Sequence, residues 1–234
     1  MKPDFNFDVD LKNFDLTVKT RAFNTRYINP PKSQDIPEHK LKYAYAADLA
    51  RDMVISKTGR VFVILAGSFI FGDFIEALCV EKNLHIKEMT ISTLSLSQNN
   101  VDSLSNLLTG GFVDNLNLIV SDYFFSHERQ GLIPYLYEKL DFDDRFQLAV
   151  AGTHCKTCIF ETHSGLKVVM HGSANLRSSA CLEQLAIEID ADLYDFNKEY
   201  QDSILKTYLT IKKPLRVQKL WQAVQKFSHP TTKE

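Results

Sequence analysis

The chain has 234 residues, of which 44% are hydrophobic and 24% are charged, and its formal net charge is −2. This is ordinary globular composition, and the length suffices for one sizeable domain with extensions. The charge excludes a strong global positive field that would recruit nucleic acid, which leaves only a local basic face for that purpose.

The beginning of the chain, "MKPDFNFDVD", is acidic and lacks an apolar core, so we expect no signal peptide. The longest apolar run, "VFVILAGSFIF", is too short to span a bilayer. We therefore expect a cytoplasmic protein without a membrane partner, in which Cys79, Cys155, Cys158 and Cys181 are reduced. The basic side chains after Leu205 are typical of a solvated helix face, and they would also suit nucleic-acid phosphates.

The first 39 residues differ in pattern from the rest of the chain. "FNFDVDL" alternates apolar and polar side chains with the period of a half-buried strand. "NPPKSQDIPEHK" is typical of an irregular linker, because proline lacks an amide donor and fixes φ. We expect residues 1–39 to form an arm on the core or on a partner, and a β-hairpin joined to the core fits the same pattern.

From Leu41 onward, apolar runs of strand length alternate with segments of helical periodicity. The expected helices are 41–56, 71–83, 99–111, 127–141, 193–209 and 214–227, and the expected strands are 60–67, 84–93, 115–122, 145–152, 156–161, 166–172 and 184–190. This order predicts an α/β fold with a mixed sheet sandwiched by helices. We assign residues 40–192 to this domain and residues 193–234 to a C-terminal helical extension.

The stretch "THCKTCIFETHSGLKVVMHGSANLRSS" gathers three histidines and two cysteines. A zinc site would use Cys155 and Cys158, which point to opposite faces if this segment is a strand. A cysteine nucleophile would pair Cys155 with His154, yet neighbours in a strand also point apart. The zinc site would need a turn in the expected strand, and the nucleophile would need a bulge.

A third interpretation uses the same alternation. His154 and Lys156 share one face of the expected strand, and the returning strand ends in Ser173 and Asn175. A helix expected at 174–184 would add backbone donors and the positive end of its dipole. Imidazole, ammonium, hydroxyl and amide groups that converge in this way suit a phosphate group.

This combination resembles the HKD motif of the phospholipase D superfamily. The matching residues are His154, Lys156, an acidic residue at Glu161, Gly172, Ser173, Asn175 and the later acidic residue Glu183. The resemblance covers about residues 59–190 by pattern, and its sharp part is 154–183. The segment after Gly172 is also similar to proteins of bacterial and phage genomes. The family usually has aspartate where this chain has Glu161, for which we expect a structural role.

The resemblance implies phosphodiester hydrolysis without a metal or another cofactor. One His154 would attack phosphorus to form a phosphohistidine, while a second histidine would protonate the leaving oxygen and later activate water. Lys156 would stabilise the added negative charge, Ser173 and Asn175 would position the phosphate oxygens, and Glu183 would orient a histidine.

The chain contains one copy of the motif. "SDYFFSHERQG" has His127 without a lysine two residues later, and His85-Ile86-Lys87 lacks the Gly-Ser-x-Asn sequel. Single-motif members of the family obtain the second histidine from a homodimer, so the resemblance implies a symmetric dimer.

The expected substrate is DNA or RNA, because small single-motif relatives are often nucleases. A lipid phosphodiesterase fits less well, since lipid-active relatives usually carry two motifs in a longer chain. A catalytically weak or inactive module that binds nucleic acid or protein is the alternative from a different class. Glu161 and the modest net charge keep that alternative open.

Overall fold

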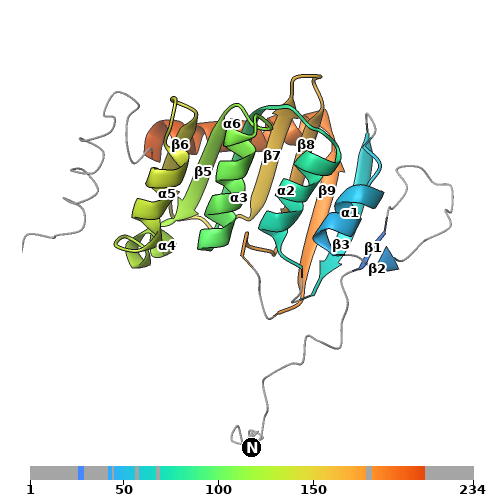
Figure 1. Ribbon diagram of the computed structural model, residues 1–234, viewed down its shortest axis with the longest axis horizontal. Coiled ribbons are helices and arrows are strands. Elements are labelled where there is room, and N and C mark those ends of the chain that lie inside the picture. Colours follow the sequence, from blue (N-terminus) through green and yellow to red (C-terminus); the bar gives the residue numbers. More distant parts are fainter. Residues whose placement is uncertain are drawn as a thin grey trace, which may run out of the picture.

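The computed structural model describes residues 26–28, 42–43, 45–55, 58–66, 69–177 and 181–208. One nine-stranded sheet organises them, in the order β2-β1-β3-β9-β8-β7-β4-β5-β6 (Figure 1). The strands are β1 (Arg26–Ile28), β2 (Lys42–Tyr43), β3 (Gly59–Leu65), β4 (Ile86–Thr93), β5 (Leu116–Ser121), β6 (Phe146–Ala151), β7 (Thr157–Thr162), β8 (Lys167–Gly172) and β9 (Glu183–Ile189).

The sheet has two halves that differ in strand direction. β4, β5 and β6 run parallel to one another. The pairs β7–β8, β8–β9, β3–β9, β1–β3 and β1–β2 are antiparallel. The halves meet where β4 pairs antiparallel with β7, which places Ser92 opposite Thr157. The beginning of β7 therefore lies at the edge where the parallel strands end.

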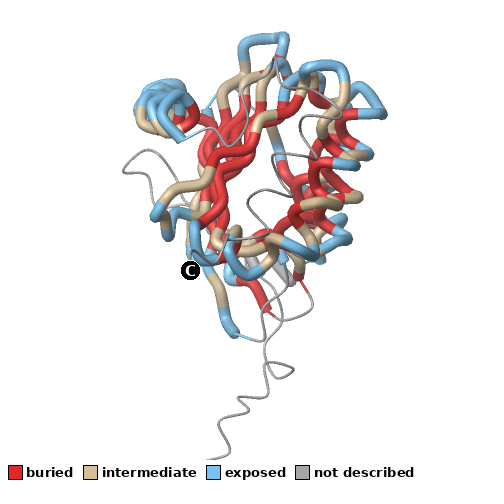
Figure 2. The backbone as a smooth tube through the Cα atoms, turned by 90° about the vertical axis from the view of Figure 1, so that its left-hand side faces the viewer, coloured by how far each residue is buried: buried red, intermediate tan, exposed pale blue. Residues whose placement is uncertain are grey.

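Helices cover the two faces of the sheet unequally. They are α1 (Ala46–Asp52), α2 (Phe71–Glu81), α3 (Gln98–Thr109), α4 (Asp122–His127), α5 (Leu132–Leu140) and α6 (Ala191–Tyr208). α1, α2, α3 and α5 form a layer on one face, and α6 lies on the other (Figures 1 and 2). Figure 2 shows the buried strands between these layers, which is why β5 is buried at every position.

The main core lies between the sheet and the larger helix layer. The side chains of Phe74 and Leu78 from α2 and of Leu108 from α3 are at most 1% exposed there. Full burial of one such side chain contributes roughly 1.5–3 kcal/mol to folding. Ser97 caps α3 by accepting a hydrogen bond from Asn100 N, and the Asn100 side chain accepts one from Ser97 N in return.

α6 is attached to the sheet by apolar contacts of Tyr194 and Leu205 and by several polar contacts. Tyr194 packs against β7 and β8 in a small second core. Lys198 Nζ lies 2.9 Å from Glu88 Oε2 on β4. The Gln201 side chain is fully buried, and its Nε2 donates to Thr157 Oγ1 at 2.9 Å. The buried Gln201 Oε1 has no hydrogen-bond partner among the described residues. These contacts link the last helix described to the first residue of β7.

The predicted α/β fold with a mixed sheet between helices is confirmed. The strands expected from residue 59 to residue 151 and the helices expected at 71–83 and 99–111 fall within a few residues of the observed bounds. The helix expected at 127–141 is wrong at its start, because α5 covers Leu132–Leu140 and a separate helix, α4, covers Asp122–His127. α1 is shorter than the helix expected at 41–56, because β2 occupies Lys42–Tyr43. Within the described part of the chain, no helix combines the length and the apolar content needed to cross a membrane.

Two expectations concern residues outside the described ones, namely the strand at 5–11 and the helix at 214–227. β1 lies inside the expected arm and pairs with both β2 and β3. The boundaries drawn at residues 39 and 192 stay predictions.

Replacing Gly172 with alanine should destabilise the protein. A Cβ at this position would collide with the backbone carbonyl oxygen of Gln184 in the neighbouring strand, whereas a Cβ at Gly152 would meet no atom within 4 Å. We expect Gly172→Ala to lower the free energy of unfolding by about 1–3 kcal/mol, as overpacking against a rigid backbone does. Urea unfolding measures this, and Gly152→Ala is the matched control. Equal unfolding midpoints for the two variants would contradict the close strand approach.

The four cysteines should divide into two reactivity classes. Cys79 and Cys158 are buried, while Cys155 and Cys181 are exposed. Burial raises the pKa of the Cys79 thiol to about 12 and that of Cys158 well above its usual value. Because the thiolate is the reactive form, a thiol reagent such as Ellman's should label two cysteines of the native protein rapidly. The other two should react only after unfolding, and Cys155→Ser should remove one rapid equivalent. A third rapid thiol in the native wild-type protein would argue against this core.

Candidate active site at one edge of the sheet

Residues from several loops meet at a single edge of the sheet. β4, β5 and β6 end at this edge, β7 begins there, and the connection from β8 to β9 crosses it. His154 and Lys156 lie in the loop before β7, while Ser173 and Asn175 follow β8, and Glu183 begins β9. The structure thus brings the five residues proposed for catalysis and phosphate binding to one edge.

The strand expected at 156–161 is observed as β7, which begins one residue later, and His154 lies in the loop before it. β7 starts at Thr157, so strand alternation does not set the directions of His154 and Lys156. The loop backbone is held by its neighbours instead. Ser92 Oγ donates to Cys155 O at 3.3 Å, and Gly172 N donates to Lys156 O at 3.2 Å.

The two side chains of this loop differ in their contacts. His154 is exposed, and its imidazole makes no hydrogen bond to another described residue. Lys156 is half-buried, and its Nζ donates to the backbone oxygen of His154 at 2.8 Å. An ammonium group has three donors, so two remain for a phosphate group. The loop therefore presents an imidazole beside a cation.

Ser173 and Glu183 form a hydrogen-bonded pair across the ends of β8 and β9. Ser173 Oγ donates to Glu183 Oε2 and accepts from Gln184 N at 3.0 Å. Ser173 N also donates to Gln184 O at 3.0 Å. The carboxylate that was expected to orient a histidine is hydrogen-bonded to the serine within one chain.

The prediction of a helix at 174–184 is wrong. Residues 173–177 bend across the sheet edge towards β4 and α2, and β9 already begins at Glu183. The side chains of Ala174 and Leu176 are buried, and Leu176 O accepts from Gly72 N at 2.9 Å. Burial of these two side chains and pairing with Gly72 outweigh the helical propensity of the segment. No helix dipole from 174–184 therefore acts on a phosphate here.

The side chain of Asn175 is held in place where residues 173–177 pass the end of β4. Its Oδ1 accepts from Leu94 N at 3.1 Å and from Thr93 Oγ1 at 3.4 Å. Leu94 N can only donate, which identifies the oxygen of the amide and directs Nδ2 away from this backbone group. Asn175 Nδ2 has no hydrogen-bond partner among the described residues. The amide group is thus oriented by β4 and retains a donor for a ligand.

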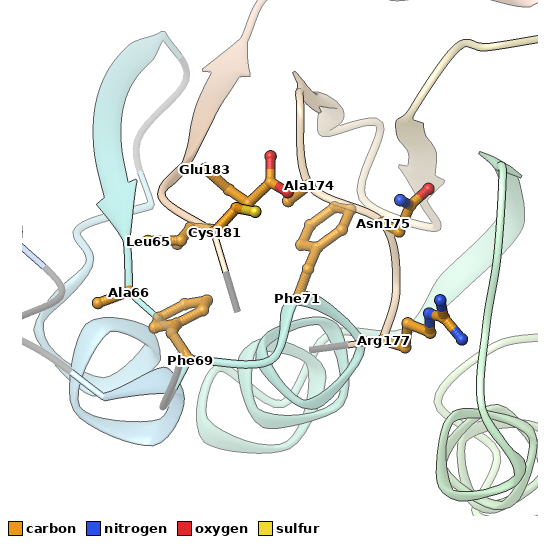
Figure 3. A pocket seen from close by; sticks show the side chains of 9 residues that line it. All are labelled: Leu65, Ala66, Phe69, Phe71, Ala174, Asn175, Arg177, Cys181 and Glu183. Carbon is orange, nitrogen blue, oxygen red and sulfur yellow. The ribbon is translucent and has the colours of Figure 1, made fainter. Parts of the chain in front are cut away.

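A small pocket lies beside these residues (Figure 3). Asn175 and Glu183 line it together with apolar side chains from the end of β3 and the start of α2. Arg177 also belongs to its lining, and its side chain is exposed. The sequence interpretation missed Arg177, because it assigned this residue to a helix rather than to a loop at the site.

Other candidates lie away from this group. Glu161 is on the sheet face that α6 covers, near the far end of β7 and opposite Lys167. Burial raises the pKa of the Tyr194 phenol to about 12, and the Glu161 carboxylate contributes to this rise. His163 Nε2, also at that far end, lies 2.7 Å from Asp114 Oδ2. The structural role expected for Glu161 stays a prediction.

His171 lies near the site edge but is held by charged partners. Its Nε2 is 3.2 Å from Glu188 Oε1, and Arg60 Nη2 is 2.7 Å from the other oxygen of that carboxylate. Burial alone would raise the pKa of Glu188, but the hydrogen bonds from Arg60 and His171 outweigh it and lower the pKa. His171 therefore belongs to an ion-pair cluster on the α6 side of the sheet.

No known protein family matches the sequence, and no curated protein does either. Several solved structures have a similar fold. NucT from Helicobacter pylori is 14% identical, with a TM-score of 0.47 over 65% of this chain and 98% of that one. Nuc from Salmonella typhimurium, described as a phospholipase D family member, is 13% identical, with a TM-score of 0.41 over 52% of this chain and 80% of that one. Phosphatidylserine synthase from Haemophilus influenzae is 12% identical, with a TM-score of 0.45 over 73% of this chain and 45% of that one. At such identities the likeness concerns the fold alone.

Proposed function

We propose that the chain is a metal-independent phosphodiesterase of the phospholipase D type that cleaves DNA or RNA. The observation that supports this most strongly is the gathering of His154, Lys156, Ser173, Asn175 and Glu183 at one sheet edge. These groups combine a nucleophile, a cation and neutral donors, which is the set that phosphoryl transfer without a metal requires.

The reaction proceeds in two displacements. His154 attacks phosphorus and forms a P–N bond while the P–O bond to the leaving oxygen breaks, and the partner's His154 gives that oxygen its proton. The partner's His154 then takes a proton from water, whose oxygen attacks phosphorus and releases the first histidine. Lys156 and Asn175 Nδ2 stabilise the added charge on the equatorial oxygens in both steps.

The second histidine comes from a homodimer in this proposal. His154 is exposed, so a two-fold axis near the sheet edge can bring two such imidazoles together. His85 and His163 lie at the opposite edge of the sheet, and His171 is engaged by Glu188. His127, on α4, also lies at the edge of the sheet that carries His154. It is the alternative source of the second histidine within the same chain.

The first prediction from the proposed function concerns cleavage of nucleic acid. Wild-type protein should cleave labelled DNA or RNA in excess EDTA, and His154→Ala should lower kcat by roughly 10³-fold or more, because the nucleophile is lost. Gel analysis of single- and double-stranded substrates measures this. Cleavage that depends on added Mg²⁺ would contradict the proposed chemistry. Salt-sensitive binding without any cleavage would favour the inactive binding module, in which Glu183 stays bound to Ser173.

A second prediction separates a shared site from one built within a single chain. Wild-type and His154→Ala chains are unfolded together, refolded and assayed at different mixing ratios. If each site needs one His154 from each protomer, activity should fall with the square of the wild-type fraction. A linear fall would contradict the shared site. Loss of activity in His127→Gln, together with that linear fall, would identify His127 as the second histidine.

Asn175 gives a third prediction, with two substitutions that divide its roles. Asn175→Ala removes the acceptor for Leu94 N and should cost about 1 kcal/mol of stability. Asn175→Asp keeps an acceptor there but replaces the Nδ2 donor by an oxygen that repels phosphate. Both variants should raise KM for the oligonucleotide, while only Asn175→Ala should lower the urea midpoint. An unchanged KM in both would exclude Asn175 from phosphate binding.

A further inference from the structure

α4 places an aromatic pair at the same edge as the candidate active site. The helix begins at Asp122, directly after β5, and Ser121 is the register partner of Ala151 at the end of β6. The loop that carries His154 leaves the sheet after Ala151. α4 and this loop therefore leave the same edge from neighbouring strands.

The aromatic pair consists of Tyr123 and His127. Tyr123 is 64% exposed, and its ring centroid lies 4.0 Å from that of His127, which is also exposed. His127 Nδ1 is 2.8 Å from Tyr123 O, so the imidazole is held against the same turn of helix. Phe124 is the buried side chain of α4 and anchors it in the core. We call these two rings the aromatic platform; α4 holds them in place at the solvent-exposed surface.

The strand order places the start of α4 between the two ends of the loop that carries His154, because β5 lies between β6 and β7 in the sheet. β5 and β7 both flank β4, so their ends lie two strand spacings apart, roughly 10 Å. Such a separation suits a base near the scissile phosphate rather than the scissile nucleotide itself. The two rings are therefore assigned to a position beside the reacting group, and this inference takes the partner's His154, not His127, as the second histidine.

A cation with no partner among the described residues lies at the same edge of the sheet, in the segment after β8. Arg177 is exposed and makes no hydrogen bond or ion pair with another described residue. Leu176, the residue before Arg177, accepts a hydrogen bond from Gly72 N of α2 and donates one to Thr93 Oγ1 of β4. In Figure 3 its guanidinium points away from the pocket, on the side of Asn175. It is free to contact a phosphate that flanks the one at Lys156.

We propose that Tyr123 and His127 stack an unpaired nucleobase while Arg177 contacts the adjoining backbone, so that the substrate is single-stranded nucleic acid. Single-strand sites combine aromatic stacking with a cation that follows the backbone, and both are present at this edge. A base inside a duplex is stacked on its neighbours and does not offer its face to the platform. This inference rests on the proposed function, because it assumes a phosphate at His154.

The test uses binding and cleavage separately. In the His154→Ala background, fluorescence anisotropy compares a labelled single-stranded oligonucleotide, the same strand with abasic positions, and a duplex. Tyr123→Leu should weaken binding of the intact single strand about tenfold and leave the abasic strand unchanged, because one stacking contact is lost. Tyr123→Phe should restore binding. Arg177→Ala should weaken both strands and reduce the salt dependence of binding.

The matched control is Tyr45→Leu, since Tyr45 is also 64% exposed but lies before α1. With His154 intact, Tyr123→Leu should raise KM for the oligonucleotide and leave hydrolysis of bis(4-nitrophenyl) phosphate unchanged. Equal loss in Tyr45→Leu and Tyr123→Leu, equal loss on intact and abasic strands, or tighter binding of the duplex would overturn the platform. Absence of any cleavage would count against the proposed function alone, because the anisotropy comparison still decides the base contact.

Discussion

The antiparallel pairing of β4 with β7 is the constraint on which the arrangement of the site depends. It joins a parallel half of the sheet to an antiparallel half and reverses the chain direction at the centre. As a result, the loop before β7 opens at the edge where β4, β5 and β6 end. A parallel β7 would send His154 and Lys156 to the opposite edge, away from Ser173 and Asn175.

At the site, backbone contacts fix the loops and leave the reactive groups available. The carbonyl oxygens of Cys155, Lys156 and Leu176 each accept a hydrogen bond from a neighbouring segment. The His154 imidazole and the Arg177 guanidinium lie outside this network and are exposed. Fixing the backbone before substrate arrives reduces the conformational entropy lost on binding. The exception is Ser173, whose hydroxyl must leave Glu183 before it can serve a phosphate.

Local patterning predicted the strands and most of the helices of the central domain, because each strand there is apolar and these helices have a clear periodicity. It did not predict α4. The spacing of a known motif also predicted that the polar residues of the candidate site converge, and the structure places them at one edge of the sheet. Their catalytic roles stay a prediction. Local patterning failed at 173–184, where the burial of Ala174 and Leu176 against α2 is a tertiary effect that a helix-like composition conceals. It also missed Arg177 and Tyr123. Their significance comes from the sheet edge on which they lie, and the strand order that defines this edge is not encoded in any single segment.

The buried Gln201–Thr157 contact links the position of α6 to the loop that carries His154 and Lys156. Gln201 is on α6, and Thr157 directly follows Lys156 in the chain. Breaking this contact leaves more of the amide without a partner in a buried place, which is costly, so the two segments move together. A displacement of α6 would consequently act on Thr157, the residue next to Lys156. α6 is therefore structurally coupled to the candidate site, although it lies on the opposite face of the sheet from most of the helices.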